Sequence, residues 1–374
     1  MDFNLYIPIN VISGENAVRE NSNKLSLFGK TCLIVTGGKS SRLCGALSDM
    51  ENALKKEGIA YSIYDKIGPN PRLDHCFEAG EIARQSGADF IVGIGGGSPL
   101  DAAKAVAVYA ANESLGIEEI YTVTERHKAL PIVLVGTTAG TGSEVGKVSV
   151  LANPVTGRKK SISPLDCYPS LTFADPKYTE SMPFDVTVST ALDAMAHVLE
   201  GYMSTKCTDI PTLFGEKAIE LIWKGLSFLH KHKNEKALPD KELRAELYYG
   251  SLYAGITLAY CGTAFPHPLG YILTENFGTP HGKACTVFMD SFIDRASVYT
   301  PDRLEKALSI INTDKESFKK VIAELTDVND ISMTEEEITG FCKRFDTAPG
   351  NFIFSPGGFT KEDAEAVLRT KFLK

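Results

Sequence analysis

Short apolar runs alternate with helical patterns over the first 180 residues of the chain. Runs of six mostly apolar residues, typical of buried strands, occupy positions 31–36, 60–65, 89–94, 131–136 and 170–175. Segments between them, such as 48–58 and 74–87, repeat apolar residues at helical spacing and end in glycine, as helix C-termini often do. Strands that alternate with helices in this way predict a parallel sheet covered by helices.

The pattern changes near residue 181, where strand signals nearly vanish. Long helical patterns take their place, for example at 188–204, 215–233 and 241–260. We therefore predict two domains, an α/β dinucleotide-binding domain over 1–180 and a helical metal-binding and substrate domain over 181–374, with a cleft between them.

Composition narrows the classes of partner. The 374 residues are 43% hydrophobic and 23% charged, and the formal net charge is −8. Such a charge offers no basic field for nucleic acid or an anionic membrane, so small molecules are the expected partners. No apolar run approaches the length of about 18 residues that spans a bilayer, and residues 1–10 lack the features of a signal peptide. We expect a cytoplasmic protein whose eight cysteines, none of them in a CxxC pair, are reduced and mostly buried.

A glycine turn joins a predicted strand to a predicted helix within 89–111. Gly95, Gly96 and Gly97 have no side chains, so a phosphate could approach the backbone at the positive end of the helix. Ser98, Pro99 and Asp101 are expected to serve as N-cap, first helical residue and capping-box acid. The alternative is a well-capped helix after a flexible turn, with no ligand.

A second loop, 135–146, also follows a strand and is rich in small hydroxyl residues such as Thr137 and Thr138. Two loops at the carboxyl ends of parallel strands suit one extended ligand such as a dinucleotide. Taken alone, this loop could equally be an ordinary hydroxyl-rich turn.

The loop after the strand at 31–36 bears on which dinucleotide binds. It contains Gly37, Gly38, Lys39, Ser40, Ser41 and Arg42 and no acid. Because an acid usually accepts the ribose 2′-hydroxyl of NAD(H), this loop favours NADP(H) over NAD(H). Alternatively, it is a solvent-facing turn whose cations bind nothing.

Four residues of the second half form a candidate metal site. Asp193 and His197 are four residues apart in a helical pattern, so they share one face. His267 and His281 stand at the two ends of a segment containing Pro268, Gly270, Gly278 and Pro280, which we expect to fold back so that the rings converge. One oxygen and three nitrogens suit Fe²⁺ or Zn²⁺ rather than Ca²⁺ or Mg²⁺. A single DxxxH pair is more often an exposed polar pair.

Four ordered motifs resemble those of the iron-containing (group III) alcohol dehydrogenases: "GGGSPLDAAKA", "TTAGTGSEV", "LDAMAHVLEGY" and "HPLGYILTENFGTPHG". The resemblance extends from about residue 5 to 300. The stretch "GKSSRLCGALSDM" is more similar to the NADP-preferring branch of butanol and 1,3-propanediol dehydrogenases than to lactaldehyde reductases.

The resemblance implies a Rossmann-like N-terminal α/β domain, an all-α C-terminal metal-binding domain (the dehydroquinate synthase-like architecture), a homodimer and a metal between the domains. Its metal ligands, which are also its catalytic residues, would be Asp193, His197, His267 and His281. Tyr271 stands where many members carry a histidine proposed as a proton relay, so the proton would pass through water, the cofactor ribose or the tyrosine hydroxyl. The matching cofactor contacts are Asn70, Gly96, Gly97, Ser98, Asp101, Thr137, Thr138 and Lys160.

The expected function is hydride transfer between NADP(H), alternatively NAD(H), and a small primary alcohol or aldehyde. The metal, Fe²⁺ or alternatively Zn²⁺, would act as a Lewis acid on the substrate oxygen. Two other classes remain open. One is a metal- and NAD-dependent lyase of the dehydroquinate synthase type, although the motifs show little of the basic density that its anionic substrate needs. The other is a non-catalytic nucleotide- or metal-sensing protein.

Overall fold

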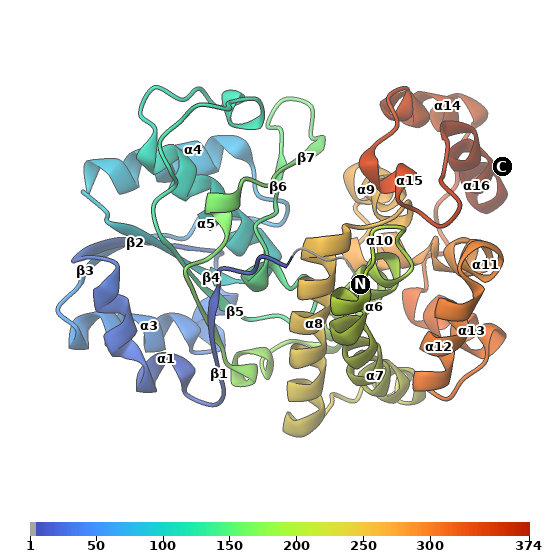
Figure 1. Ribbon diagram of the computed structural model, residues 1–374, viewed down its shortest axis with the longest axis horizontal. Helices are drawn as coiled ribbons and strands as arrows, with labels where there is room; N and C mark the ends of the chain where they lie inside the picture. The colour runs from blue at the N-terminus through green and yellow to red at the C-terminus, as the bar shows by residue number, and fades with distance from the viewer. Residues whose placement is uncertain (1–4) are drawn as a thin grey trace. The chain divides into compact units, whose positions relative to one another are not determined.

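The computed structural model describes residues 5–374, which divide into two compact units, Leu5–Met182 and Pro183–Lys374 (Figure 1). The first unit contains a parallel sheet, and the second is built of helices. This arrangement confirms the predicted fold class. Among the described residues, no helix combines the length and the apolar character needed to cross a membrane.

Six parallel strands form the sheet of the first unit. They are β1 (Asn10–Ser13), β2 (Thr31–Thr36), β3 (Ala60–Tyr64), β4 (Phe90–Gly95), β5 (Ile132–Gly136) and β8 (Leu171–Ala174). Their order across the sheet is β1-β8-β5-β4-β2-β3. The strand β1 therefore pairs with β8, which is the last of the six along the chain. Every residue of β4 is buried because strands flank it and helices cover both faces, which explains its nearly continuous apolar sequence.

The strand pattern missed three elements. These are β1 and the antiparallel hairpin of β6 (Ser149–Ala152) and β7 (Lys159–Ile162). Each has four residues, and β1 and β7 are partly exposed and polar, so they lack the apolar run that marked the other strands.

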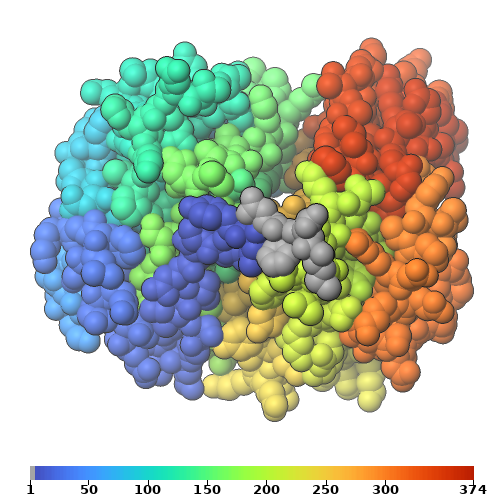
Figure 2. Space-filling model, viewed as in Figure 1, coloured from blue at the N-terminus to red at the C-terminus, as the bar shows by residue number. Residues whose placement is uncertain are grey.

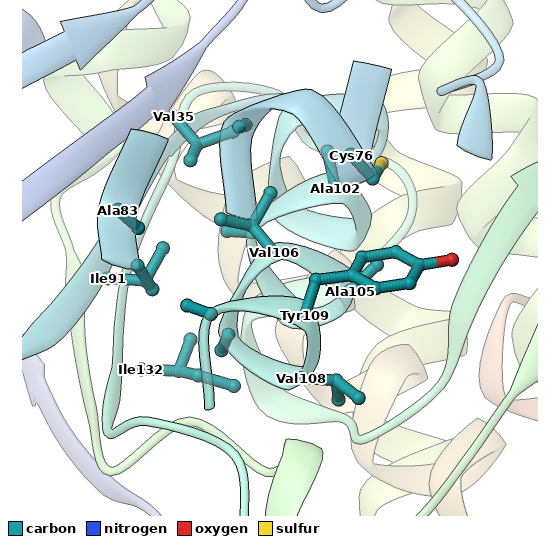
Figure 3. Close-up of a cluster of buried hydrophobic side chains, with 14 of the residues drawn as sticks. Val35, Cys76, Ala83, Ile91, Ala102, Ala105, Val106, Val108, Tyr109 and Ile132 are labelled. Atoms are coloured by element: carbon teal, nitrogen blue, oxygen red, sulfur yellow. The ribbon is translucent and has the colours of Figure 1, made fainter. Parts of the chain in front are cut away.

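Two pairs of helices cover the sheet. In Figure 1, α1 (Ala17–Glu20) and α3 (Ala46–Lys56) lie on one face, and α4 (Leu73–Gln85) and α5 (Gly97–Ala111) on the other. Because alternate residues of a strand point to opposite faces, Leu33 and Val35 pack with α4 and α5 while Cys32 and Ile34 pack with α1 and α3. Figure 3 shows the first of these clusters, and Figure 2 gives the view of Figure 1 with the atoms drawn as spheres.

The second unit, residues 183–374, contains eleven helices. They are α6 (Phe184–Tyr202), α7 (Asp209–Lys231), α8 (Lys241–Cys261), α9 (Pro266–Phe277), α10 (His281–Thr286), α11 (Met289–Tyr299), α12 (Pro301–Ile310), α13 (Lys315–Thr326), α14 (Glu335–Cys342), α15 (Gly350–Ile353) and α16 (Lys361–Phe372).

Short helical turns complete both units. They are α2 (Ser40–Leu43) and the 3₁₀ helices η1 (Ser22–Leu27), η2 (Glu119–Tyr121), η3 (Ser143–Val145), η4 (Leu165–Cys167), η5 (Pro176–Thr179) and η6 (Lys343–Phe345). All eight cysteines are free, and all but Cys44 are buried, as the sequence predicted.

The predicted cap of α5 is wrong. The helix begins at Gly97, with Gly96 as an N-cap that has extended backbone and no side-chain bond, so Ser98 lies inside the first turn. The Asp101 carboxylate does not close a capping box. It accepts hydrogen bonds from Ser143 Oγ at 2.6 Å and from Val150 N at 2.9 Å. Contacts with the following loop therefore outweigh local capping preferences here.

A buried carboxylate joins three elements of the first unit. Asp49, on α3, accepts hydrogen bonds from Arg19 Nε at 2.7 Å and Tyr178 OH at 2.9 Å, and its Oδ2 lies 3.0 Å from Lys177 Nζ. Burial raises the pKa of Asp49, but the hydrogen bonds from Lys177, Arg19 and Tyr178 outweigh it and hold the pKa below its ordinary value. The negative charge of Asp49 therefore stabilises the folded unit.

Replacing this carboxylate, Asp49→Asn, should lower the free energy of unfolding at pH 7 by about 1 to 2 kcal/mol. The hydrogen bonds to a buried charge are weakened, but water still solvates Arg19, whose side chain is 61% exposed. The folded pKa is depressed, so the stabilisation is complete above the unfolded pKa of about 3.9 and is lost as the pH falls through the folded value. Urea unfolding followed by circular dichroism from pH 7 to pH 2 should show the two proteins converging in acid. Asp302→Asn, at an exposed position, is the control. A difference that is the same at every pH would contradict this account.

Candidate active site

One face of α6 carries three buried polar side chains. Asp193, His197 and Glu200 follow one another at intervals of four and three residues, so all three lie on the same side of the helix. Their exposed fractions are only 4%, 7% and 0%. Buried ionisable groups are costly unless they are paired or bind a cation, so this face marks a specific site.

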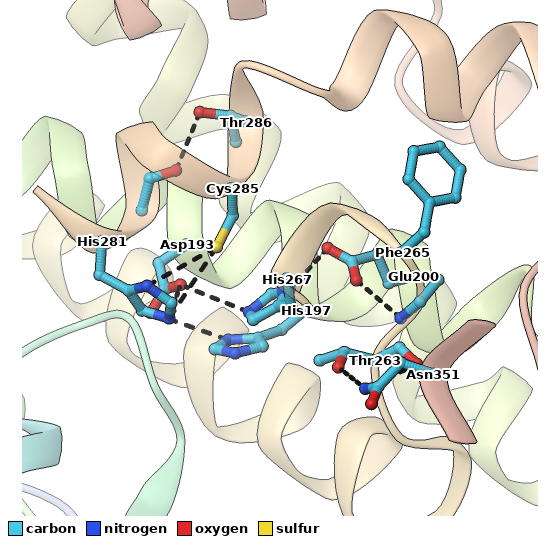
Figure 4. A network of polar contacts seen from close by, with 12 residues as sticks. Asp193, His197, Glu200, Thr263, Phe265, His267, His281, Cys285, Thr286 and Asn351 are labelled. Carbon is cyan, nitrogen blue, oxygen red and sulfur yellow. Dashed lines mark hydrogen bonds and ion pairs between the residues drawn. The ribbon is translucent and has the colours of Figure 1, made fainter. Parts of the chain in front are cut away.

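Three imidazole rings surround the Asp193 carboxylate (Figure 4). His197 Nδ1 lies 3.9 Å from Oδ2, while His267 Nε2 and His281 Nε2 lie 3.8 and 3.9 Å from Oδ1. The rings of His197 and His267 are stacked, with centroids 4.5 Å apart. The structure therefore brings all four predicted metal ligands around one carboxylate. His197 faces the second oxygen, and the group whose ligand atoms all lie within 4.8 Å of one another consists of Asp193, His267, His281 and Cys285.

The two distant histidines converge through a helical hairpin, not through a segment broken throughout. Pro268 and Gly270 lie inside α9, and only Gly278 and Pro280 form the turn. Gly278 has a φ of 67°, which favours glycine at a helix end. The predicted role of Pro268 and Gly270 as breaks is therefore wrong, because proline is tolerated in the first turn of a helix.

Close helix packing sets the position of His281. A Cβ on the neighbouring Gly282 would lie 1.8 Å from the Ser189 carbonyl oxygen and 2.9 Å from Asp193 Cβ. Only glycine lets α10 approach the backbone of α6 this closely. The contact places His281 beside Asp193, although the two are 88 positions apart in the chain.

Glu200 is a site residue that the sequence analysis missed. Its Oε1 lies 2.7 Å from His267 Nδ1, and its Oε2 accepts a hydrogen bond from Ala264 N at 2.7 Å. Burial raises the pKa of Glu200, and the nearby His267 opposes this shift. A carboxylate that accepts the Nδ1 proton leaves Nε2 of the same ring facing the site. Its spacing from Asp193, two helical turns, was the signal that could have revealed it.

Nε2 of His267 tests whether the residues fit a metal. This atom is buried and makes no hydrogen bond among the described residues. Around one ion, ligand atoms at about 2.1 Å lie roughly 3.4 Å from one another, close to the separations seen here. Burial lowers the pKa of His267, but Cys285 and Glu200 outweigh it and raise that pKa well above its ordinary value. The anionic surroundings therefore favour positive charge at this ring, either as a proton or as a cation at Nε2. The unpartnered nitrogen and the ligand separations fit a divalent metal.

Two more side chains adjoin the histidines. The Tyr271 ring lies nearly parallel to that of His281, with centroids 5.6 Å apart and an angle of 17°. Cys285, one turn after His281 on α10, places Sγ 3.7 Å from Nδ1 of that ring. The sequence analysis predicted only that the cysteines are reduced and mostly buried, so it missed the position of Cys285 beside the histidines. The spacing of four residues from His281 was the signal that could have revealed it.

The predicted nucleotide-binding loops lie at the carboxyl ends of three neighbouring strands. Gly37 and Gly38, Gly96 and Gly97, and Thr137 and Thr138 follow the neighbouring strands β2, β4 and β5. A Cβ on Gly96 would lie 3.0 Å from Thr138 Cγ2, so these two loops are in direct contact. Glycines here allow both loops to expose backbone N–H groups at the same edge.

Other predicted cofactor residues differ in their surroundings. Asn70 has a φ of 58° and donates its N–H to Ser98 Oγ at 3.2 Å, which joins the loop after β3 to α5. Ser41 is fully buried, and its Oγ accepts a hydrogen bond from Thr36. Ser40, which begins α2, is exposed.

Lys160 lies on the strand β7 and not on one of these loops. It is exposed on β7, and its Nζ lies 4.6 Å from the centroid of the Tyr121 ring. Asp101 faces Ser143 and Val150, so its carboxylate holds the second loop in place.

Two family models match the chain. Residues 8–176 match "Iron-containing alcohol dehydrogenase", and residues 187–338 match "Fe-containing alcohol dehydrogenase family, C-terminal". An NADPH-dependent butanol dehydrogenase from Clostridium saccharobutylicum is 26% identical over 330 residues, or 86% of this chain and 82% of that protein. Lactaldehyde reductase from Escherichia coli is 28% identical over 279 residues, or 74% and 71%. The crystal structure of an iron-containing alcohol dehydrogenase from Thermotoga maritima matches with a TM-score of 0.90 at 32% identity, covering 99% of each chain.

Gly282→Ala should separate α10 from α6, because the added Cβ would overlap the Ser189 carbonyl oxygen. We expect the affinity for Zn²⁺ to fall at least about 100-fold, measured by competition with a chromophoric chelator. Gly340→Ala is the matched control, since a Cβ at this exposed position of α14 meets nothing within 4 Å. Equal zinc affinity in the two variants would refute the packing argument.

Glu200→Gln should keep the shape of the site and weaken its hold on His267, because the charge that accepts the Nδ1 proton is lost. Loss of such a partner typically lowers metal affinity by about 10- to 100-fold. Zinc competition and circular dichroism would show weaker binding with unchanged helix content. Glu216→Gln, which alters a partner of the Tyr202 hydroxyl, should bind zinc normally. Normal binding by Glu200→Gln as well would remove Glu200 from the site.

Proposed function

This chain belongs to the iron-containing alcohol dehydrogenase family, whose activity is NAD(P)-dependent oxidation and reduction at CH–OH groups, and on that premise we propose that it interconverts small primary alcohols and aldehydes with NADP(H). The observation that carries the proposal is the buried cluster in which Asp193 is surrounded by His197, His267 and His281. The butanol dehydrogenase among the relatives supports the substrate class.

A divalent cation held by these four residues would act as a Lewis acid on the substrate oxygen. The chain's own residues prepare the site for it. Asp193 contributes the negative charge, and Glu200 fixes the ring of His267 so that Nε2 faces inward. Burial of Asp193, His197 and His267 excludes water, whereas the His281 side chain is 30% exposed and gives the site its open side.

Tyr271 stacks on this exposed histidine. The Tyr271 ring would orient His281. The alcohol proton would leave through the Tyr271 hydroxyl, through water or through the cofactor ribose. The proposed nucleotide contacts are those predicted from the sequence, with Asp101 and Ser41 acting by positioning the loops.

The preference for NADP(H) rests on the loop after β2. Residues 37–42 contain no acid that could accept a ribose 2′-hydroxyl. Arg42 lies 3.4 Å from Asp65, but both side chains are about half exposed, and such a pair is weak enough for a phosphate to displace. Lys39 and Arg42 therefore remain available to a 2′-phosphate.

The proposal includes Fe²⁺ as the metal, with Zn²⁺ as the alternative, since both accept nitrogen and carboxylate ligands. It also includes a homodimer in the cytoplasm. Free thiols at all eight cysteine positions agree with a reducing compartment.

Two other functions are less well supported. A lyase of the dehydroquinate synthase type needs a basic pocket for an anionic sugar-acid phosphate, and the sequence motifs of this chain show little basic density. A purely sensing protein would not need a buried carboxylate with three histidines gathered around it.

The direct test is oxidation of NADPH and NADH at 340 nm with butanal. The protein is prepared without oxygen, stripped with a chelator and reloaded with Fe²⁺ or Zn²⁺. We expect turnover that depends on metal and is faster with NADPH. No turnover with either metal across a panel of short aldehydes would favour the lyase or sensing functions.

Gly38→Asp should reverse the cofactor preference. A side chain at Gly38 meets nothing within 4 Å, whereas one at Gly37 would lie 2.9 Å from the Ile67 carbonyl oxygen. The new carboxylate would repel a 2′-phosphate and could accept a 2′-hydroxyl. We expect kcat/KM for NADPH to fall about 10- to 100-fold, with no fall for NADH. Gly340→Asp, far along the chain in α14, adds the same charge and should change neither value. An unchanged NADPH value in Gly38→Asp would place the 2′-phosphate elsewhere.

A further inference from the structure

Cys285 offers the metal site a fifth donor atom. One ligand atom each from Asp193, His267, His281 and Cys285 lie within 4.8 Å of one another. Sγ is 3.7 and 3.9 Å from the two ring nitrogens of His281. Figure 4 shows the thiol on the same side of α10 as His281, above the carboxylate. The proposed hydride transfer requires no thiol at this point.

The packing around Cys285 holds its sulfur in this position. The residue is fully buried, and a Cβ on Gly270 would lie 2.8 Å from Sγ and 3.0 Å from the Cys285 backbone. Glycine at position 270 therefore lets α9 and α10 meet at the cysteine. On the next residue, Thr286 Oγ1 bonds to Gly282 O at 2.9 Å and lies 2.8 Å from Thr326 Oγ1, which anchors the end of α10.

A second, independent observation points to a ligand at the same place. His267 is only 2% exposed, and its Nε2 makes no hydrogen bond among the described residues although it faces Asp193 at 3.8 Å. A buried cysteine can serve merely as a small apolar side chain. A thiol surrounded by a carboxylate and two imidazoles, one of them with an unpartnered nitrogen, is instead placed as a metal donor is placed.

We propose that Cys285 is a metal ligand in this chain, and that its sulfur makes the site prefer Zn²⁺ over Fe²⁺. This inference rests on the proposed function, because it concerns the same metal site. On binding, the thiol releases one proton to solvent and the sulfur donates an electron pair to the ion, with no change of oxidation state. Thiolate is a softer donor than imidazole or carboxylate, and so favours zinc over a harder ferrous ion.

Cobalt titration of the metal-free protein without oxygen is the test. Visible d–d bands report bound cobalt, while a near-ultraviolet sulfur-to-cobalt charge-transfer band reports the thiolate. We expect both signals in the wild type and in Cys342→Ser, a control at a buried cysteine of α14. Cys285→Ser should keep the visible bands and lose the charge-transfer band. Its zinc affinity should fall at least about 10-fold, with a change of less than about 3-fold for Fe²⁺.

The outcomes separate this proposal from the function on which it rests. Visible bands without a charge-transfer band in the wild type would overturn the cysteine ligand and leave the four-residue metal site intact. Failure of the wild type to bind cobalt at all would overturn both. If Cys285→Ser does not fold, zinc-edge absorption of the wild type decides instead. One sulfur at about 2.3 Å supports the ligand, and a shell of only nitrogen and oxygen refutes it.

Discussion

The helical unit depends on a buried negative charge that must be balanced. Asp193 and Glu200 place two carboxylates on one buried face of α6, and His267 lies between them, with Nδ1 toward Glu200 and Nε2 toward Asp193. Uncompensated carboxylates at such depth would cost several kcal/mol each. The imidazoles supply part of the compensation, and the proposed cation would supply the rest. This requirement explains why α9 and α10 bring their histidines to α6. Gly282 lets α10 approach α6, and Gly270 lets α9 approach α10.

The sheet unit solves a similar problem with a buried lysine. Lys104 is fully buried on α5 and donates to Ser143 O, Ser143 Oγ and Val148 O at 2.7 to 2.8 Å, close to Asp101. Burial lowers the pKa of Lys104 and raises that of Asp101, while each group opposes the shift of the other. Because the network satisfies these groups within the protein, it fixes the second loop.

The fold class followed from the sequence because parallel strands buried on both faces, such as β4, need nearly continuous apolar residues. The start of α5 did not follow from the sequence, because packing of Gly96 and Gly97 against Thr138 and Thr141 overrides the capping preference of Ser98. Helical spacing placed Asp193 and His197 on one face. No spacing rule could place His281 there, because its position depends on a contact between Gly282 and Ser189. Glu200 and Cys285 carry only a weaker signal in the sequence, which is their helical spacing from Asp193 and from His281.

The order of the elements along the chain has a consequence for biosynthesis. The sheet closes when β1 pairs with β8, so the unit Leu5–Met182 is complete before any metal ligand has been made. Domains generally fold as units from the N-terminus during translation. A ribosome-bound chain could therefore hold a dinucleotide long before it could hold an ion, which must wait until α10 has left the exit tunnel. In the proposed function, metal loading would therefore follow the folding of the sheet unit.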